Sequence, residues 1–186
     1  MRSTSPTIRG LTLAELLIGI TILGILAGLA FTSIQSQWQR ERITSTAQEL
    51  IGWLESSRRM SLRGASCKAD IADGSVNLGG MLAKISSSTS NCSSIPKLNL
   101  TGITNGYTIS VSSTGLDESL KLSQGITSIT FTPRGTIDTS TGASNKVIML
   151  TLQPGGAARC ISIRNLVASM QMGKISGSNC DTTSGY

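Results

Sequence analysis

The sequence predicts an α+β protein in which a long N-terminal helix packs on a mostly antiparallel, β-rich head. Three observations predict this class. An uncharged apolar run, Leu16 to Phe31, follows a short leader that contains Arg2 and Arg9. Helical periodicity then continues without proline as far as Arg63. From Ala65 onward, Gly, Ser, Thr and Asn become frequent and apolar residues alternate with polar ones, as in strands joined by turns.

The first helical segment is long enough to cross a membrane. Residues 11–31 would span about 31 Å as a helix, close to the thickness of a hydrocarbon core. Glu15 lies near its start, where a carboxylate costs on the order of 2.5–3.5 kcal/mol and therefore needs a partner or a task. Cleavage after Gly10 would expose the α-amine of Leu11, a cation that Glu15 of the same or a neighbouring chain could neutralise.

Two other interpretations of this segment remain open. The small residues Gly28 and Ala30 ahead of Phe31 fit a secretory signal peptide that is removed after Ala30, although Glu15 is unusual in such an apolar region. A plain transmembrane anchor with an incidental glutamate is the second alternative.

Residues 32–64 are predicted to continue the helix as an amphipathic segment that packs on the head. Its apolar residues recur at mostly three- and four-residue steps: Ile34, Trp38, Ile43, Ala47, Leu50, Ile51 and Leu54. Gly64 is expected to end the helix as its C′ residue. Arg58, Arg59 and Arg63 lie near that end, where the helix dipole favours cations; contact with nucleic acid is the alternative role.

Residues 65–186 are predicted to form one β-rich head. Strands are expected at residues 67–72, 81–85, 107–112, 129–132, 147–152, 160–163 and 166–175. The continuous apolar run 147–152 indicates a central strand, and Pro154-Gly155-Gly156 joins it to the next strand as a hairpin. Residues 181–186 are expected to be a loose polar tail.

The four cysteines all lie in the head, which beyond a membrane would be in an oxidising environment. An even number predicts two disulfides; three pairings are possible, and we favour the sequence-local pairs Cys67–Cys92 and Cys160–Cys180. A zinc site is the rival interpretation, which the absence of histidine and of CxxC spacing disfavours.

The composition argues against an enzyme. The chain contains no histidine, so a Ser-His or Cys-His pair is excluded. The neighbouring acids Asp70 and Asp73, like Asp117 and Glu118, lie among turn residues and lack a metal-binding loop. We therefore expect no catalytic residues, no metal and no cofactor. The formal charge of +6, or +4 without Arg2 and Arg9, permits contact with nucleic acid but does not demonstrate it.

The stretch Gly10-Leu11-Thr12-Leu13-Ala14-Glu15-Leu16-Leu17 resembles the class III signal of type IV pilins and type II secretion pseudopilins. The resemblance implies a leader at residues 1–10, cleavage between Gly10 and Leu11 by prepilin peptidase, and methylation of Leu11. It also implies that residues 11–31 form the transmembrane and filament-core helix and that Glu15 sets assembly register. Leu11 replaces the usual phenylalanine, and Thr32 stands where many pilins have proline.

The same resemblance implies location and partners. The chain would cross the bacterial inner membrane once, with its head extracytoplasmic, and then enter a periplasmic or cell-surface helical filament. Its partners would be prepilin peptidase, other pilins or pseudopilins, the inner-membrane assembly platform and, before assembly, the membrane itself.

A second resemblance concerns the head, whose helix-end arginines, Phe131-Thr132-Pro133-Arg134-Gly135 and Arg159-Cys160-Ile161-Ser162-Ile163 look like the GspH/FimT-type minor pseudopilin domain. It implies a structural or priming minor subunit. The alternative is a filament-tip subunit, such as a DNA receptor, because some members bind DNA through a C-terminal Gly-Arg-x-Arg element. Here Gly173-Lys174-Ile175-Ser176 carries one cation, and the candidate contacts are Arg159, Arg164 and Lys174.

Overall fold

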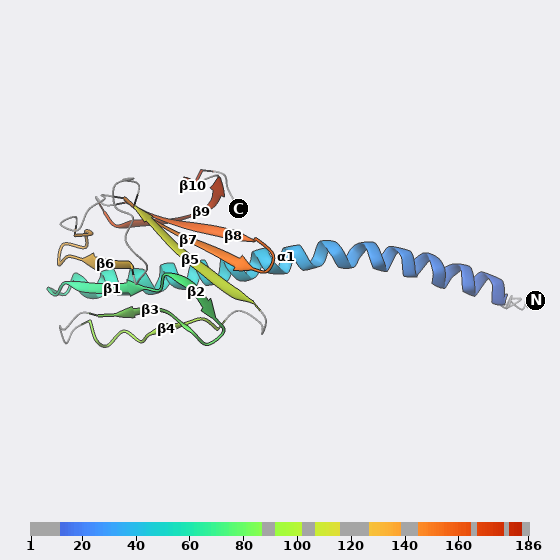
Figure 1. Cartoon of the computed structure of the whole chain (residues 1–186), viewed down its shortest axis with the longest axis horizontal. Helices are drawn as coiled ribbons and strands as arrows, with labels where there is room; N and C mark the ends of the chain where they lie inside the picture. Colours follow the sequence, from blue (N-terminus) through green and yellow to red (C-terminus); the bar gives the residue numbers. More distant parts are fainter. Residues whose placement is uncertain are drawn as a thin grey trace, which may run out of the picture. The chain divides into compact units, whose positions relative to one another are not determined.

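The computed structural model describes residues 12–86, 92–101, 107–115, 127–138, 145–164, 167–176 and 179–183, without the side chains of residues 29–35, 113–115, 127 and 145. The chain divides into two compact units, one ending at Trp38 and the other beginning at Gln39. The head and all described strands belong to the second unit (Figure 1).

Helix α1 covers Leu13–Ser61, 49 residues. Thr12 precedes it, and the Thr12 carbonyl accepts hydrogen bonds from the backbone N–H groups of Glu15 and Leu16 at 3.1 and 3.2 Å. At the other end Gly64 has a φ of +98°, in the left-handed region that glycine adopts without a steric penalty. The prediction that Gly64 follows the helix as its C′ residue agrees with this backbone conformation.

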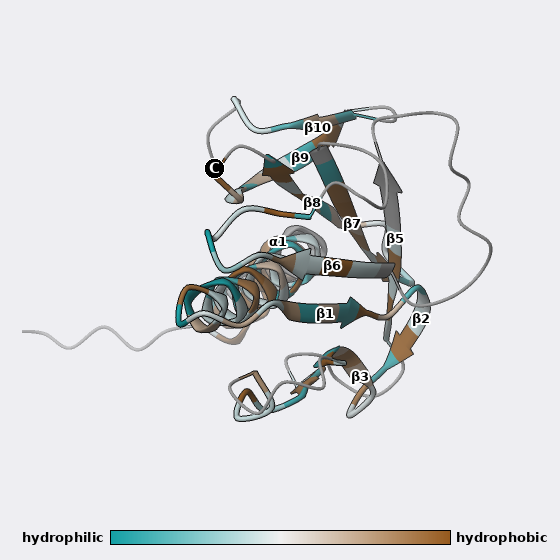
Figure 2. Ribbon diagram, turned by 90° about the vertical axis from the view of Figure 1, so that its left-hand side faces the viewer, coloured by the Kyte–Doolittle hydropathy of each residue, from teal (hydrophilic) through white to brown (hydrophobic). Residues whose placement is uncertain are grey.

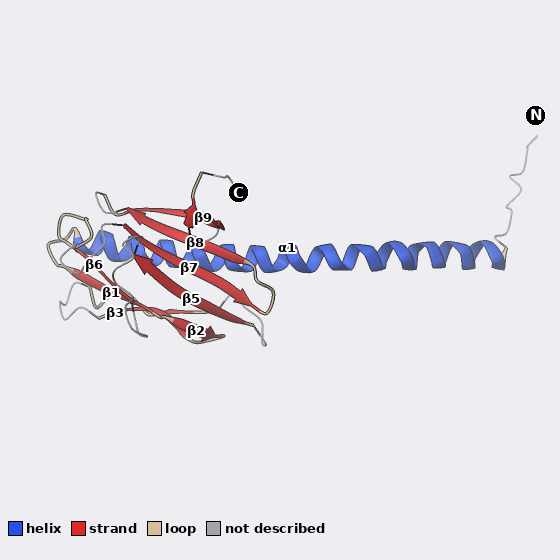
Figure 3. Cartoon of the chain, turned by 45° about the horizontal axis from the view of Figure 1, so that its top comes forward, coloured by secondary structure: helices blue, strands red, loops and turns tan. Residues whose placement is uncertain are grey.

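The described strands are β1 (Cys67–Ile71), β2 (Gly74–Asn77), β3 (Met81–Ile85), β4 (Leu98–Asn99), β5 (Thr108–Gly115), β6 (Thr127–Phe131), β7 (Asn145–Gln153), β8 (Ala158–Arg164), β9 (Ser169–Ser176) and β10 (Asn179–Asp181). Figure 3 shows these strands together with the helix. Every strand pairing among the described residues is antiparallel. The predicted α+β class with a mostly antiparallel sheet is therefore confirmed.

The strands form two sheets, of order β4-β3-β1-β6 and β10-β9-β8-β7-β5-β2. The predicted central strand is β7, which pairs with β5 on one side and β8 on the other. Strands β7 and β8 form the expected hairpin, closed by hydrogen bonds from Leu152 to Ala157 and from Gly156 to Leu152. Apolar residues of both strands can thus face the core at every second position.

The main hydrophobic core joins the second half of α1 to both sheets. Ile43, Ala47, Leu50 and Leu54 are fully buried in the same cluster as residues of β1, β6, β7 and β8. Figure 2 looks along the helix and shows strands of both sheets gathered around it. The three- and four-residue spacing of these side chains explains the contact, since it puts them on one helix face.

Two tryptophans depart from the predicted pattern. Trp38, expected on the buried face, is 58% exposed. Trp53 is the buried one, at 7%, and its Nε1–H donates to the carbonyl oxygen of Pro96 at 2.7 Å. The side chain of Ile34 lies outside the described residues. The hydrogen bond of Trp53 therefore connects the loop around Pro96 to the helix.

Three strands were not predicted: β2, β4 and β10. They are short, with four, two and three residues, and lack a clear apolar alternation. The prediction of a loose tail from residue 181 is wrong at its first residue, because Asp181 pairs with Lys174 of β9. Residues 184–186 lie outside the described residues, as do Asp117 and Glu118.

Candidate functional site

The structure forms both favoured disulfides, Cys67–Cys92 and Cys160–Cys180. The second connects β8 to β10 beside Gly173 of β9, which is opposite Cys160 in the β8–β9 register. A Cβ at Gly173 would meet the Asp181 carbonyl group and would lie 3.1 Å from the Cys180 Sγ. Gly173 matches the glycine of the DNA-binding element in the sequence. In this structure the lack of space for a Cβ explains why a glycine occupies this position.

The N-terminal end of α1 has the spacing of a capping box. Thr12 precedes the helix, and its Oγ1 accepts a hydrogen bond from the Glu15 backbone N–H at 3.4 Å. Glu15 is three residues later, in the first turn, where the helix dipole favours a carboxylate. This local role was not predicted from the sequence, although the Thr-x-x-Glu spacing indicates it. Gly10 and Leu11 lie outside the described residues.

The first unit exposes an apolar helix surface. Between 53% and 78% of each large apolar side chain is accessible at Leu13, Leu16, Leu17, Ile18, Ile20, Ile22, Leu23, Ile25 and Leu26. Apolar exposure of this kind marks a surface for another protein or for lipid. Only one charged residue, Glu15, occurs between positions 12 and 28.

The three candidate nucleic-acid residues do not form one patch. Arg159 is half-buried, and its Nε donates to Thr44 Oγ1 of the helix at 3.1 Å. Arg164 is exposed at the opposite end of β8, five residues away and therefore on the other sheet face. Lys174 lies on β9, opposite Asp181, and also takes part in a polar or electrostatic interaction. The hydrogen bond to Thr44 therefore supports a structural role for Arg159.

Two of the arginines near the end of α1, Arg58 and Arg59, contact other protein groups. Arg58 Nε donates to the Gly135 carbonyl at 3.0 Å, and its Nη1 pairs with Glu55 at 3.3 Å. Arg59 pairs more weakly with the same carboxylate at 3.7 Å, with its side chain 76% exposed. Arg58 thus connects the helix end to the turn after β6, in agreement with a structural role.

Lys146 links the two sheets, because its Nζ donates to the Ser128 carbonyl of β6 at 3.0 Å. Desolvation by burial lowers the pKa of Lys146, and the nearby charge of Asp138 acts in the opposite direction. Among the described residues, no group of three or more His, Cys, Asp or Glu side chains could hold a metal ion.

These features define a class of protein: a β-rich, disulfide-bonded head on a helix whose N-terminal part is apolar, exposed and marked by one carboxylate in its first turn. Residues 6–31 match the family model described as the prokaryotic N-terminal methylation motif. This match indicates a type IV pilin-like prepilin that is processed by prepilin peptidase and assembles with other pilins. Searches of curated proteins and of solved structures found no match.

Within the described part of the chain, no helix is both long and apolar enough to cross a membrane.

Proposed function

We propose that the chain is a minor pilin or pseudopilin subunit of a type IV pilus or a type II secretion pseudopilus, with a structural or priming role. One observation carries the proposal: the methylation motif at residues 6–31 leads into a helix whose apolar side chains are exposed. In this proposal prepilin peptidase cuts between Gly10 and Leu11 and methylates the new amino terminus.

The exposed apolar surface of such a subunit would need to be covered both before and after assembly. Lipid would cover residues 11–31 before assembly, with the head on the extracytoplasmic side of the inner membrane. Neighbouring helices would replace the lipid in the filament, on the cell surface or in the periplasm. The two disulfides support an oxidising location for the head.

Glu15 supplies register in this proposal. A buried carboxylate costs free energy unless it meets a cation and hydrogen-bond donors. The α-amine of Leu11 on an adjacent subunit is such a cation, and only some axial offsets between helices bring the two groups together.

The head is proposed as a structural module and not an enzyme. Its partly buried arginine contacts, Arg159 with Thr44 and Arg58 with Gly135, stabilise the fold. A DNA receptor is the less supported alternative, because Arg159 and Arg164 lie on different faces of the sheet.

Mass spectrometry of the amino-terminal peptide, from protein purified from its own cells, tests the proposal. A chain that begins at Leu11 with one added methyl group is expected. A chain that begins at Phe31 would mean a secreted soluble domain, and an intact Met1 would mean an unprocessed membrane anchor. Either result would contradict the proposal.

A further inference from the structure

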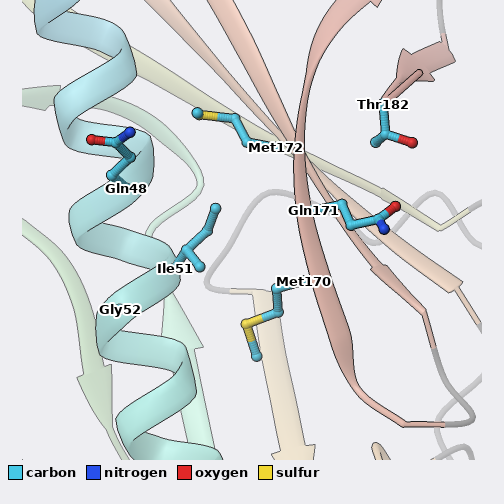
Figure 4. Close-up of a pocket in the computed structure, with 7 residues that line it drawn as sticks. All are labelled: Gln48, Ile51, Gly52, Met170, Gln171, Met172 and Thr182. Atoms are coloured by element: carbon cyan, nitrogen blue, oxygen red, sulfur yellow. The ribbon is translucent and has the colours of Figure 1, made fainter. Parts of the chain in front are cut away.

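A groove lined by both apolar and polar side chains separates α1 from β9. One part, of about 530 Å³, is lined by Gln48, Ile51, Gly52, Met170, Gln171, Met172 and Thr182. The next part, of about 520 Å³, shares Ile51 and Met170 and continues past Val167 to Glu55 and Arg58. Figure 4 shows Ile51 of the helix and the two methionines of β9 directed into the space between them, while Gln171 points away from the helix.

One wall of the groove is a strand edge that is only partly covered by the described strands. β9 pairs with β8 through residues 169–173, but β10 borders β9 only at residues 174–176. The chain then turns, because the backbone N–H and the hydroxyl of Thr183 both donate to the Asp181 carboxylate at 2.9 and 2.7 Å. No described strand lies beside residues 169–173 on the side away from β8. Gly173 is buried and lies against the Asp181 carbonyl group, so the part of this edge that another strand could reach is residues 169–171.

The opposite wall contains a glycine that the chain's own packing does not explain. Gly52 lies inside α1, where glycine costs about 1 kcal/mol relative to alanine. A Cβ at Gly52 would have no neighbouring atom within 4 Å. The glycine therefore leaves room beside the helix, and room of this kind permits the close approach of another backbone.

The charge of the groove limits the kind of occupant. Residues 169–173 carry no charge, and the charged residues among the described ones that line the groove, Glu55 and Arg58, form an ion pair at 3.3 Å. Exposed edge strands are usually protected by charges, prolines or bulges. An uncharged edge is complementary to an uncharged strand, and residues 169–173 themselves offer no cations to a nucleic acid.

We propose that an extended, uncharged segment of a neighbouring filament subunit adds to the open edge of β9 and places alternate apolar side chains in the groove. Its backbone would pair with residues 169–171, and its side chains would contact Met170, Met172 and Ile51. Gly52 would allow the segment to lie close to α1. The identity of the partner as a filament subunit rests on the proposed function; the groove and its open edge do not.

Photo-cross-linking of the full chain in its own cells tests this inference. The probe is p-benzoylphenylalanine in place of Gln171, on the strand edge, and the control probe replaces Leu78, which is 42% exposed and does not line the groove. Gly52→Leu fills the groove and should preserve the helix, since leucine favours helix more than glycine does. Ser56→Leu is the matched variant at an exposed helix position outside the groove lining.

We expect an adduct at Gln171 whose partner peptide is an uncharged extended segment of a subunit that carries the methylation motif. Its yield should fall about tenfold with Gly52→Leu and remain with Ser56→Leu, because only the first occupies the docking space. No adduct above the Leu78 control, an adduct insensitive to Gly52→Leu, or an adduct to lipid, nucleic acid or a helix would overturn the inference. A methylated Leu11 from the same cells without this adduct would leave the proposed function standing.

Discussion

Removal of the Cys160–Cys180 disulfide should destabilise the head by an amount set mainly by the loop that it closes. The two residues are 20 positions apart. The chain-entropy relation then gives about 3.3 kcal/mol at 25 °C for the double variant Cys160→Ala/Cys180→Ala. The 25-residue separation of Cys67 and Cys92 gives a similar value, about 3.5 kcal/mol, so the corresponding double variant is a matched control.

Urea unfolding of the full chain in detergent micelles, followed by tryptophan fluorescence, measures this loss. Trp53 of α1 is buried in the core that joins the helix to the head, and Trp38 is 58% exposed, so the change in fluorescence reports mainly on the unfolding of that core. A loss below about 1 kcal/mol for both double variants would refute the loop-entropy reasoning. A loss confined to Cys160→Ala/Cys180→Ala would show that the attachment of β10, rather than loop closure, determines the effect.

Three further predictions concern the turn after β7, Lys146 and Glu15. Gly155→Ala should lower the midpoint of thermal unfolding more than Gly156→Ala, because the φ of +132° at Gly155 is strained for any residue with a Cβ, whereas the φ of +68° at Gly156 lies near the left-handed region that other residues can adopt. A Cβ at Gly155 would also meet the flexible end of the Gln39 side chain, which can move aside. Equal midpoints would contradict the steric argument. The free energy of unfolding of the wild type should rise relative to that of Lys146→Met as the pH increases toward 10.5. The pKa of Lys146 is lowered in the folded protein, so the unfolded chain binds more protons than the folded chain in this pH range. A flat difference between these two proteins in urea titrations would count against burial of the ammonium group. Glu15→Ala should leave cleavage and methylation largely intact and impair incorporation into filaments, as measured by mass spectrometry and by sheared-filament immunoblots; normal incorporation would refute the register role.

Elements with strong local patterns could be predicted from the sequence. The apolar run 147–152 predicted the central strand β7, and Pro154-Gly155-Gly156 predicted the hairpin to β8. The three- and four-residue steps from Ile43 to Leu54 predicted the buried helix face. In each case a few adjacent residues determine both the conformation and the side that is buried.

The remaining features depend on contacts between distant residues. Strand β10 has polar neighbours around Cys180, and it is a strand because it pairs with β9. Trp53 is buried partly through its hydrogen bond to Pro96, 43 positions away. Arg159 resembles a candidate DNA contact in the sequence, but its contact with Thr44 depends on the packing of β8 against α1. Such tertiary effects leave little trace in a local pattern.

Glu15 has two physical explanations, and they predict different results for Glu15→Gln. As part of a capping box with Thr12, it stabilises the start of α1, and glutamine can replace glutamate in that role. As the partner of the Leu11 α-amine on a neighbouring subunit, it needs its negative charge, which glutamine lacks. If Glu15→Gln restores the incorporation that Glu15→Ala loses, helix capping is sufficient. If both variants are processed but excluded from filaments, the Glu15 carboxylate acts between subunits. The presence of a charged residue in the apolar part of the helix is then explained by filament assembly.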